Sequence, residues 1–315
     1  MRQTICMIQQ NIFDMSANYR LAKEEDVAGI STVFVDAYND LYRRHELLET
    51  PMNPNPPNPI FAFLIRKTPH AFWVAEENGK IVGYSHSFTR DSLWYLSWLF
   101  ISPSSQGRDV GRNLLERTLA SWKNSEITNR ATITFAFNPA SQFLYMKYGM
   151  YPREPAYYAE TPSKTILENS QPPNALQFQE MTSLGDLSEV LSEMDRYVLG
   201  FSLDWHHELF FETKARCYVF NEKGNPVGYA YVRPNGAVGP VAVNSSHLIK
   251  PVLDAALRLA AGQGVEKVRY YMPGSNTHAV ELALKYKMRI EPYVFMSTKP
   301  LAKWELYIFH SAALM

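Results

Sequence analysis

Apolar positions repeat at helical spacing in two distant parts of the chain. One stripe follows the spacing i, i+1, i+4, i+5, i+8 and consists of Leu114, Leu115, Thr118, Leu119 and Trp122. A second stripe has the same spacing 138 residues later and consists of Val252, Leu253, Ala256, Leu257 and Ala260. Each stripe occupies one face of a helix, so both segments are predicted to be helices that cover a core. Their equal spacing indicates an internal repeat.

Shorter matches extend this repeat along the chain. The segment "GKIVGYSHSF" (79–88) resembles "GNPVGYAYVR" (224–233), and "LYMKYGM" (144–150) resembles "LALKYKM" (282–288). The offset is 145 residues in the first pair and 138 in the second, and Ile101 matches Val243 at an offset of 142. Each half is predicted to contain a strand, two helices, further strands, a helix, a strand, a helix and a last strand. This order predicts an α/β fold with a mixed sheet (α+β), present in two copies.

The repeat defines the predicted domains. The first copy is expected at residues 18–160 and the second at 175–315, and the polar, proline-containing stretch 161–174 is predicted to be the linker. Residues 1–17 have no clear period, and Met15 is an alternative start, which leaves open whether residues 1–14 belong to the native protein.

Composition and charge exclude several classes of protein. The 315 residues are 46% hydrophobic, and 31 basic residues balance 31 acidic ones, so no global positive field favours nucleic acid or a membrane as partner. The most apolar run, Leu93–Ile101, has nine residues and is too short to cross a membrane as a helix. The N-terminus lacks the pattern of a secretory signal.

Cysteine and histidine usage predicts a cytoplasmic protein without a metal site. Cys6 and Cys217 are far apart and form neither a disulfide framework nor a ligand cluster. The segment "WHHELF" (205–210) contains adjacent histidines, His206 and His207, which point to different faces of a helix and are therefore not predicted to share a metal ion.

A glycine-containing turn links a strand to the first of the two helical stripes. In "SPSSQGRDVGRNLL" (102–115), Gly107 and Gly111 allow backbone conformations and close approaches that side chains would block. The first amides of the helix have no internal partner, and with the helix dipole they favour an anion such as a pyrophosphate. Arg108 and Arg112 add positive charge. The alternative is an ordinary strand–helix connection.

A second motif follows the apolar strand "TITFAF" (132–137). In "NPASQFLYMKYGM" (138–150), one helical face consists of Ser141, Leu144, Tyr145 and Tyr148. Gly149 is placed to end the helix. Asn138 is placed to cap its N-terminus.

Together the two motifs resemble the GNAT superfamily of acyl-CoA-dependent N-acyltransferases. The family loop Q/R-x-x-G-x-G/A matches residues 106–111 except at Asp109, and the family motif N-x-x-A-x-x-x-Y-x-x-x-G-F matches at Asn138, Tyr145 and Gly149 but departs at Ser141 and Met150. The resemblance is strong over about residues 18–158 and weaker over about 175–300. It implies two tandem GNAT-like domains, each a mixed, mostly antiparallel sheet flanked by helices.

The resemblance implies acetyl-CoA as co-substrate. Loop amides would bind its pyrophosphate, and the loop residues are Gln106, Gly107, Arg108, Asp109, Val110, Gly111 and Arg112. In the family the preceding strand separates from its neighbour and pairs with the pantetheine arm. That feature assigns Leu99, Phe100 and Ile101 to the cofactor, with a backbone N–H available to stabilise the thioester oxygen. The alternative for these apolar residues is core packing.

The resemblance also assigns catalytic roles. Tyr145 would protonate the departing thiolate, with packing as the alternative, and Asn138 would touch pantetheine while capping its helix. The general base is not evident; His86 and Asp91 are the nearest candidates, and surface or structural roles are the alternatives. Tyr95 and Ser97 could instead face the acceptor, which is expected between the early helices and the strand pair 82–101.

The second copy lacks these features. Nine residues separate Val243 from Val252, against thirteen between Ile101 and Leu114, and Ala283 stands at the position that matches Tyr145. The sequence therefore predicts an N-acetyltransferase whose first copy transfers acetyl from acetyl-CoA directly to a primary amine of a small molecule or peptide. A non-catalytic acyl-CoA sensor and an interaction scaffold are the alternatives. The acceptor, the acyl-chain preference and the oligomeric state stay open.

Overall fold

The computed structural model describes residues 17–315 except 48, 124–125, 170–175, 182 and 186. Cys6 and the alternative start at Met15 lie outside the described residues. The described chain forms two compact units: residues 17–87 with 98–123, and residues 88–97 with 126–315. The boundary between the units passes through strands β3 (Lys80–Arg90) and β4 (Leu93–Ile101).

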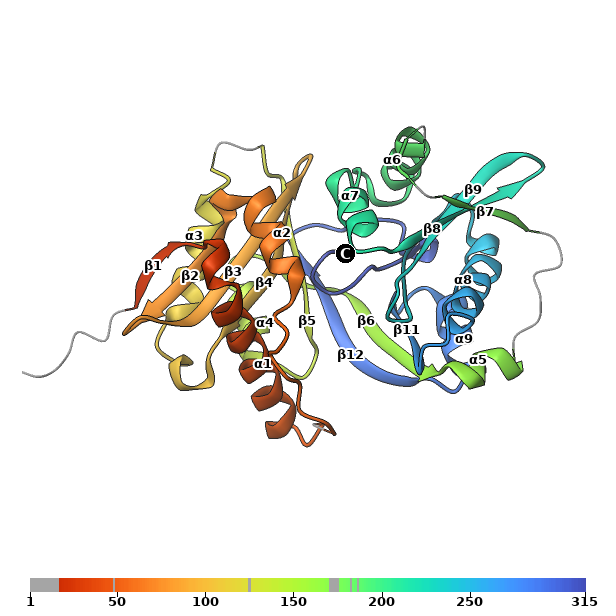
Figure 1. Cartoon of the computed structure of the whole chain (residues 1–315). Coiled ribbons are helices and arrows are strands. Elements are labelled where there is room, and N and C mark those ends of the chain that lie inside the picture. Colours follow the sequence, from red (N-terminus) through yellow and green to blue (C-terminus); the bar gives the residue numbers. More distant parts are fainter. Residues whose placement is uncertain (1–16, 48, 124–125, 170–175, 182, 186) are drawn as a thin grey trace, which may run out of the picture. The chain divides into compact units, whose positions relative to one another are not determined.

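The first unit is a sheet enclosed by helices (Figure 1). Its other strands are β1 (Asn18–Leu21) and β2 (Phe72–Glu77), and its helices are α1 (Val27–Arg44), α2 (Pro59–Lys67) and α3 (Val110–Ala120). Strand β2 pairs antiparallel with both β1 and β3. Successive side chains of β3 point to opposite faces: the Ser85 hydroxyl donates to Leu114 O of α3 at 3.1 Å, whereas the Tyr84 ring lies 5.5 Å from the Phe61 ring of α2. Helices therefore cover both faces of this sheet.

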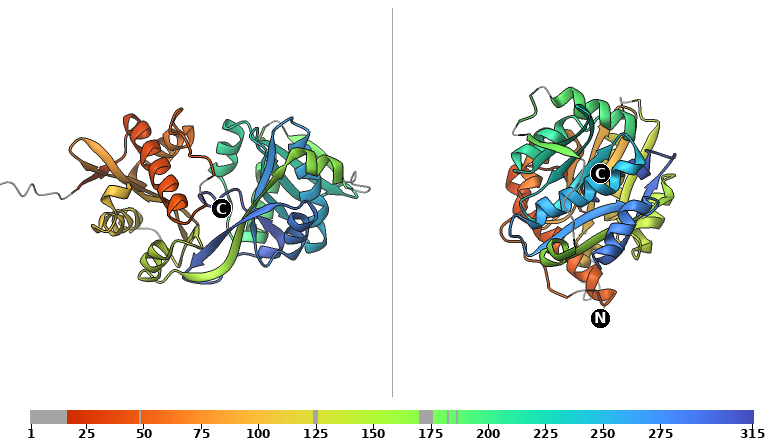
Figure 2. Two further views of the ribbon diagram at one scale, coloured as in Figure 1. Left: turned by 90° about the horizontal axis from the view of Figure 1, so that it is seen from below. Right: turned by 90° about the vertical axis from the view of Figure 1, so that its right-hand side faces the viewer.

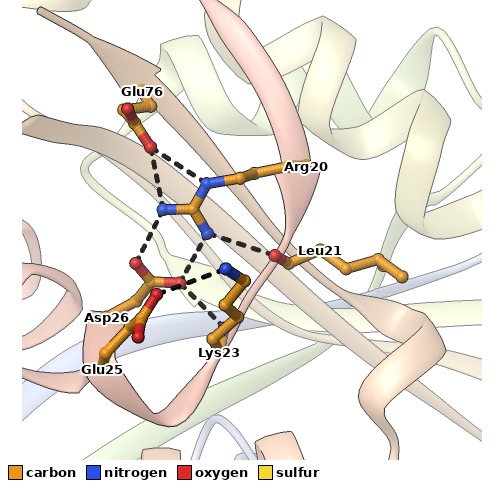
Figure 3. A network of polar contacts seen from close by, with 6 residues as sticks. All are labelled: Arg20, Leu21, Lys23, Glu25, Asp26 and Glu76. Atoms are coloured by element: carbon orange, nitrogen blue, oxygen red, sulfur yellow. Dashed lines mark hydrogen bonds and ion pairs between the residues drawn. The ribbon is translucent and has the colours of Figure 1, made fainter. Parts of the chain in front are cut away.

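A network of charges fixes the start of this unit (Figure 3). The Arg20 guanidinium lies 2.7 Å from an Asp26 oxygen and 2.8 Å from a Glu76 oxygen, and Asp26 also accepts the Lys23 N–H at 2.8 Å. Burial raises the pKa of Asp26, but the hydrogen bonds from Arg20 and Lys23 outweigh burial and bring the pKa below its ordinary value. The network joins β1, β2 and the turn that leads into α1.

The second unit contains the remaining sheet, which begins with the first half of β4. The following strands, in spatial order, are β5 (Asn129–Phe135), β12 (Arg289–Ser297), β6 (Tyr151–Pro162), β11 (Lys267–Pro273), β10 (Ala237–Val243), β9 (Asn225–Val232), β8 (Arg216–Glu222) and β7 (Gln177–Met181). Its helices are α4 (Pro139–Met146), α5 (Ser163–Asn169), α6 (Leu187–Leu199), α7 (Trp205–Glu212), α8 (Ser246–Ala261) and α9 (Thr277–Lys285). Helices α6 and α8 both contact β9 and β10, and every residue of β10 is buried, so this sheet is also covered on both faces.

The predicted repeat is confirmed by matching hydrogen bonds. Ser102 N donates to Val82 O at 2.8 Å, and Asn244 N donates to Val227 O at 2.9 Å, at the predicted offsets of 142 and 145 residues. Both copies also require glycine at the same place. A Cβ on Gly83 would lie 2.8 Å from Ile101 Cδ1, and one on the matching Gly228 would lie 2.7 Å from Ala242 O.

The two copies exchange their last strands. Strand β11 begins and ends 138 residues after β5, and β12 begins 138 residues after β6. Yet β12 of the second copy lies between β5 and β6 of the first, with Tyr293 opposite Phe135, and β6 of the first copy lies against β11 of the second, with Ala156 opposite Pro273. The exchanged strands β6 and β12 pair antiparallel along their length, as Figures 1 and 2 show.

Part of the predicted linker belongs to this sheet and its covering helices. Residues 161–162 end β6, and the next seven form α5, which contacts α8 and buries Ile166 completely. Residues 170–174, the rest of the predicted linker, lie outside the described residues. The domain boundaries at 160 and 175 stay a prediction about the repeat.

Candidate functional site

The turn between β4 and α3 has the backbone conformation that the loop motif predicts. Gly107 has a φ of 76°, and Asp109 has a φ of 59° in the left-handed region. An added Cβ on Gly107 would meet nothing within 4 Å, so the loop is open on that side. Asp is one of the few side chains that tolerate left-handed backbone, which explains how this chain departs from the family glycine at 109 and keeps the turn.

The same turn exposes a row of backbone donors. The N–H of Asn113 makes the first helical hydrogen bond of α3, to Asp109 O at 3.0 Å. No described residue accepts a hydrogen bond from the backbone N–H groups of residues 107–112. These groups lie at the start of an eleven-residue helix, where the helix dipole adds partial positive charge. The arrangement suits an anion with several oxygens.

Side chains hold the loop and neutralise its one carboxylate. Arg108 donates to Ser105 Oγ at 2.7 Å and to Glu77 Oε2 at 2.9 Å. Gln106 Nε2 donates to Ile101 O at 3.1 Å. Arg112 lies 3.2 Å from the Asp109 carboxylate. Asp109 therefore already has a cationic partner within the loop.

The residues of β4 assigned to the cofactor have alternating environments. Leu99 and Ile101 pack against the buried cluster of Ala75, Val110 and Leu114. The Phe100 ring faces the other way and lies 5.0 Å from the ring of Phe34 in α1. Their side chains thus serve core packing, the alternative left open by the sequence. Strand β4 pairs with β5 in parallel at Leu93–Tyr95, so residues 99–101 lie beyond the paired part of that strand.

In the second copy, the matching part of the strand is occupied by the protein itself. Strand β10 pairs with β11 only at Ala237 and Val238, and its next segment pairs with the short strand β13 (Tyr307–Ile308). The residues that pair with β13 are Val241 and Ala242, which match Leu99 and Phe100 at the offset of 142. The sequence gave no signal for β13, because two residues are too few to show a period.

Tyr145 and Asn138 belong to the second unit, whereas the loop belongs to the first. Asn138 Oδ1 caps α4 by accepting Ser141 N at 3.4 Å, and the matching Asn276 caps α9 by accepting Ala279 N at 3.1 Å. Tyr145 on α4 is 5% exposed, and burial raises its pKa above the ordinary phenol value. The Tyr145 hydroxyl therefore keeps its proton at neutral pH and can act only as a donor or a neutral acceptor.

His86, the candidate base, is completely buried. Its Nε2 lies 2.8 Å from Thr68 Oγ1, and the Thr68 hydroxyl donates to Leu64 O at 3.0 Å. Nε2 must therefore carry the hydrogen, which leaves Nδ1 as an acceptor without a partner among the described residues. Burial, with a smaller contribution from His70, lowers the pKa of His86 to about 3. These features favour the structural alternative, and the assignment as base stays a prediction.

This burial predicts a pH dependence of stability. Because His86 stays neutral in the fold while an unfolded histidine binds a proton below pH ~6.5, the free energy of unfolding should fall as pH decreases from that value towards about 3. One such group contributes a slope of about 1.4 kcal/mol per pH unit. In urea unfolding between pH 4.5 and 7, His86→Gln should show a slope smaller by that amount; equal slopes in both proteins would contradict the burial.

The other polar residues singled out in the sequence have partners within the protein. Tyr95 OH donates to Ala312 O at 2.6 Å and Ser97 Oγ to Ala313 O at 2.8 Å, so neither hydroxyl is left to face an acceptor. Asp91 lies at the exposed turn between β3 and β4 with a φ of 46°. Both turn and strand ends therefore contribute no further titratable group to the loop.

The adjacent histidines of α7 have different partners. His206 Nδ1 lies 2.9 Å from the Arg90 guanidinium, and His207 Nε2 lies 2.9 Å from the Asp195 carboxylate. Among the described residues, no group of three His, Cys, Asp or Glu side chains is placed to hold a metal ion. Within that same part of the chain, no helix combines the length and hydropathy that crossing a membrane requires.

Comparison with known proteins identifies the class. Residues 68–149 match the family model described as "Acetyltransferase (GNAT) domain". This segment contains the loop and the motif from Asn138 to Gly149, so the resemblance seen in the sequence is confirmed. No curated protein sequence matches the chain significantly.

Solved structures match the chain over nearly its whole length. A putative acetyltransferase from Pyrococcus horikoshii superimposes with a TM-score of 0.74 at 17% identity, covering 96% of this chain and 98% of its own. A GCN5-related N-acetyltransferase from Sphaerobacter thermophilus gives 0.63 at 14% identity, covering 92% and 98%. A tandem GNAT protein from the clavulanic acid biosynthesis pathway gives 0.61 at 15% identity, covering 90% and 99%. This chain thus carries a GNAT acetyltransferase domain within a tandem GNAT fold.

Proposed function

We propose that the first copy binds acetyl-CoA and transfers its acetyl group to a primary amine in a ternary complex. The observation that carries this proposal is the row of unpartnered backbone N–H groups at residues 107–112, at the start of α3. A diphosphate would accept hydrogen bonds from these groups, and Arg108 and Arg112 would add positive charge. The proposal places the reaction in the cytoplasm.

Each step of the reaction has a candidate residue. A backbone N–H in the segment Leu99–Ile101 would stabilise negative charge on the thioester oxygen while the amine nitrogen forms the C–N bond. The C–S bond then breaks, and the Tyr145 hydroxyl would give its proton to the leaving thiolate. The amine proton is lost to solvent or to a base, for which His86 Nδ1 is the candidate. Asn138 would border the pantetheine arm.

The second copy is proposed to bind no acyl-CoA. Strand β13 pairs with the residues that match the proposed pantetheine strand, and Asn244 and Ser245 lead directly into α8 without a glycine turn. We therefore expect one acetyl-CoA per chain.

The test combines binding with turnover. Calorimetry should give one CoA site per chain and an affinity for pantetheine at least about 100-fold lower, because pantetheine lacks the diphosphate that the loop would hold. Thiol release from acetyl-CoA should follow with at least some members of a panel of primary amines. Equal affinity for the two ligands would contradict the loop assignment. Saturable binding without thiol release would support the sensor alternative, and absence of binding the scaffold alternative.

Asp109→Gly should leave acetyl-CoA affinity unchanged or increase it. Glycine adopts the left-handed backbone at 109 without strain, and its introduction removes a negative charge beside the proposed diphosphate. Calorimetric titration of the variant and the parent protein measures this directly. A clear loss of affinity would show that the phosphate site has been placed in the wrong loop.

A further inference from the structure

Four aromatic side chains form a half-buried surface in the first unit, which we call the aromatic wall. They are Phe34 and Tyr38 of α1 and Trp98 and Phe100 of β4. The Phe34 ring stands edge-on to two of the others, 5.5 Å from Trp98 at 90° and 5.0 Å from Phe100 at 79°. Tyr38 follows one turn later on α1, with its ring 6.0 Å from that of Phe34.

The wall lies outside a separate layer that already closes the core. Phe61, Phe72 and Tyr84 are completely buried, and the Phe61 ring lies 6.5 Å from Phe34 and 5.2 Å from Trp98. Leaving several large aromatic side chains half exposed in one patch forgoes burial that the fold could otherwise use. Such patches mark binding surfaces more often than isolated exposed apolar residues do.

The wall adjoins the parts of the chain proposed to hold acetyl-CoA. Phe100 belongs to the strand segment whose backbone would run beside pantetheine, and α1 ends at Arg44, whose guanidinium lies 3.5 Å from Gln106 Oε1 of the loop. All of these residues belong to the first unit. A group bound on the wall would therefore lie next to that strand segment.

Two buried polar atoms in the same cluster have no hydrogen-bond partner among the described residues. They are the Tyr84 hydroxyl and Trp98 Nε1. The matching tyrosine of the second copy, Tyr229, donates to the Asp195 carboxylate. An unsatisfied buried donor is unfavourable, so the cluster of the first copy is built to take a partner from outside the chain.

We propose that the aromatic wall binds the acceptor, and that this acceptor is a primary amine carried on a flat aromatic group. This inference rests on the proposed acetyl transfer. Edge-to-face and offset contacts with aromatic rings favour a flat ring over an aliphatic chain of the same size. The four side chains of the wall carry no carboxylate, so polycationic amines gain no ion pair from it.

The experiment compares 2-phenylethylamine with 2-cyclohexylethylamine and putrescine at saturating acetyl-CoA. We expect kcat/KM for the aromatic amine to exceed that for each of the others by about tenfold, since one good aromatic contact accounts for a factor of that order. Phe34→Leu and Trp98→Leu should reduce this preference to about twofold or less, whereas Trp98→Phe should retain most of it. A preference that survives both leucine variants, or a wild-type preference for putrescine, would overturn the proposal.

Controls separate this inference from the proposed function. Phe178→Leu makes the same change at a 40% exposed aromatic of β7 and should alter neither the preference nor acetyl-CoA affinity. The Kd for acetyl-CoA should stay within twofold in the wall variants, which also verifies folding. If no amine is acetylated, the proposed function fails, and the wall is still tested by calorimetric binding of the two ring amines: tighter binding of 2-phenylethylamine that Phe34→Leu abolishes supports it, and equal binding overturns it.

Discussion

Cutting the chain after Pro162 is expected to leave a first half that does not form a stable monomer. In the intact protein, β12 lies between β5 and β6, and β6 pairs with β11 on its other edge. Without residues 163–315, both β5 and the twelve-residue β6 lose these neighbours and expose unpaired edges. Exposed edges favour pairing with other chains. The fragment should therefore be recovered as a dimer or as aggregate, since two fragments could exchange β6 with each other.

Size-exclusion chromatography with light scattering, together with thermal unfolding, measures this. The matched control is co-expression of residues 18–162 with 163–315, which restores every strand pair and should give a soluble one-to-one complex. A monodisperse, cooperatively unfolding monomer of residues 18–162 would show that the first copy can close its sheet with its own β6.

Tyr145→Phe is expected to lower kcat by about 100-fold, the lower end of the range for general acid catalysis. The substitution removes only the hydroxyl and preserves the buried ring, so acetyl-CoA affinity should change by less than about twofold. Because burial raises the pKa of Tyr145, the phenol stays protonated through the usual assay range. The wild-type rate should therefore show no alkaline decline from this residue below its ordinary pKa of about 10.

Tyr151→Phe provides the control, because it deletes the same hydroxyl at a 52% exposed position of β6 and should leave kcat unchanged. Steady-state thiol release at several pH values, with an amine that the enzyme accepts, gives both quantities. An unchanged kcat in Tyr145→Phe would remove this residue from the mechanism and leave packing as its role.

Local sequence signals predicted the individual elements well. Asn138 and Asn276 cap their helices as the spacing indicated, and Val82-Gly83-Tyr84 and Val227-Gly228-Tyr229 hold equivalent places in the two copies. Such features depend on a few neighbouring residues, because capping, glycine conformation and strand alternation are decided over one or two turns of chain. The offsets of the repeat then fixed which elements correspond.

Features that depend on distant parts of the chain were not predictable in this way. The partner of β6 is chosen among strands of equal hydrophobicity, and both β12 and β5 offer suitable edges. Burial of His86 depends on Thr68, eighteen residues earlier, and on the ring of Phe72 in the neighbouring strand. The pairing of Tyr95 with Ala312 spans 217 residues. No spacing rule reaches across such separations.

The strand exchange has a consequence for how this protein could have evolved. A duplicated gene half that no longer holds a cofactor is ordinarily free to decay or be deleted. Here the silent half supplies β12, which completes the catalytic half's own sheet, so deletion would dismantle the half that still works. Selection can thus erase the chemistry of one sibling while preserving its architecture, and the pair has become inseparable.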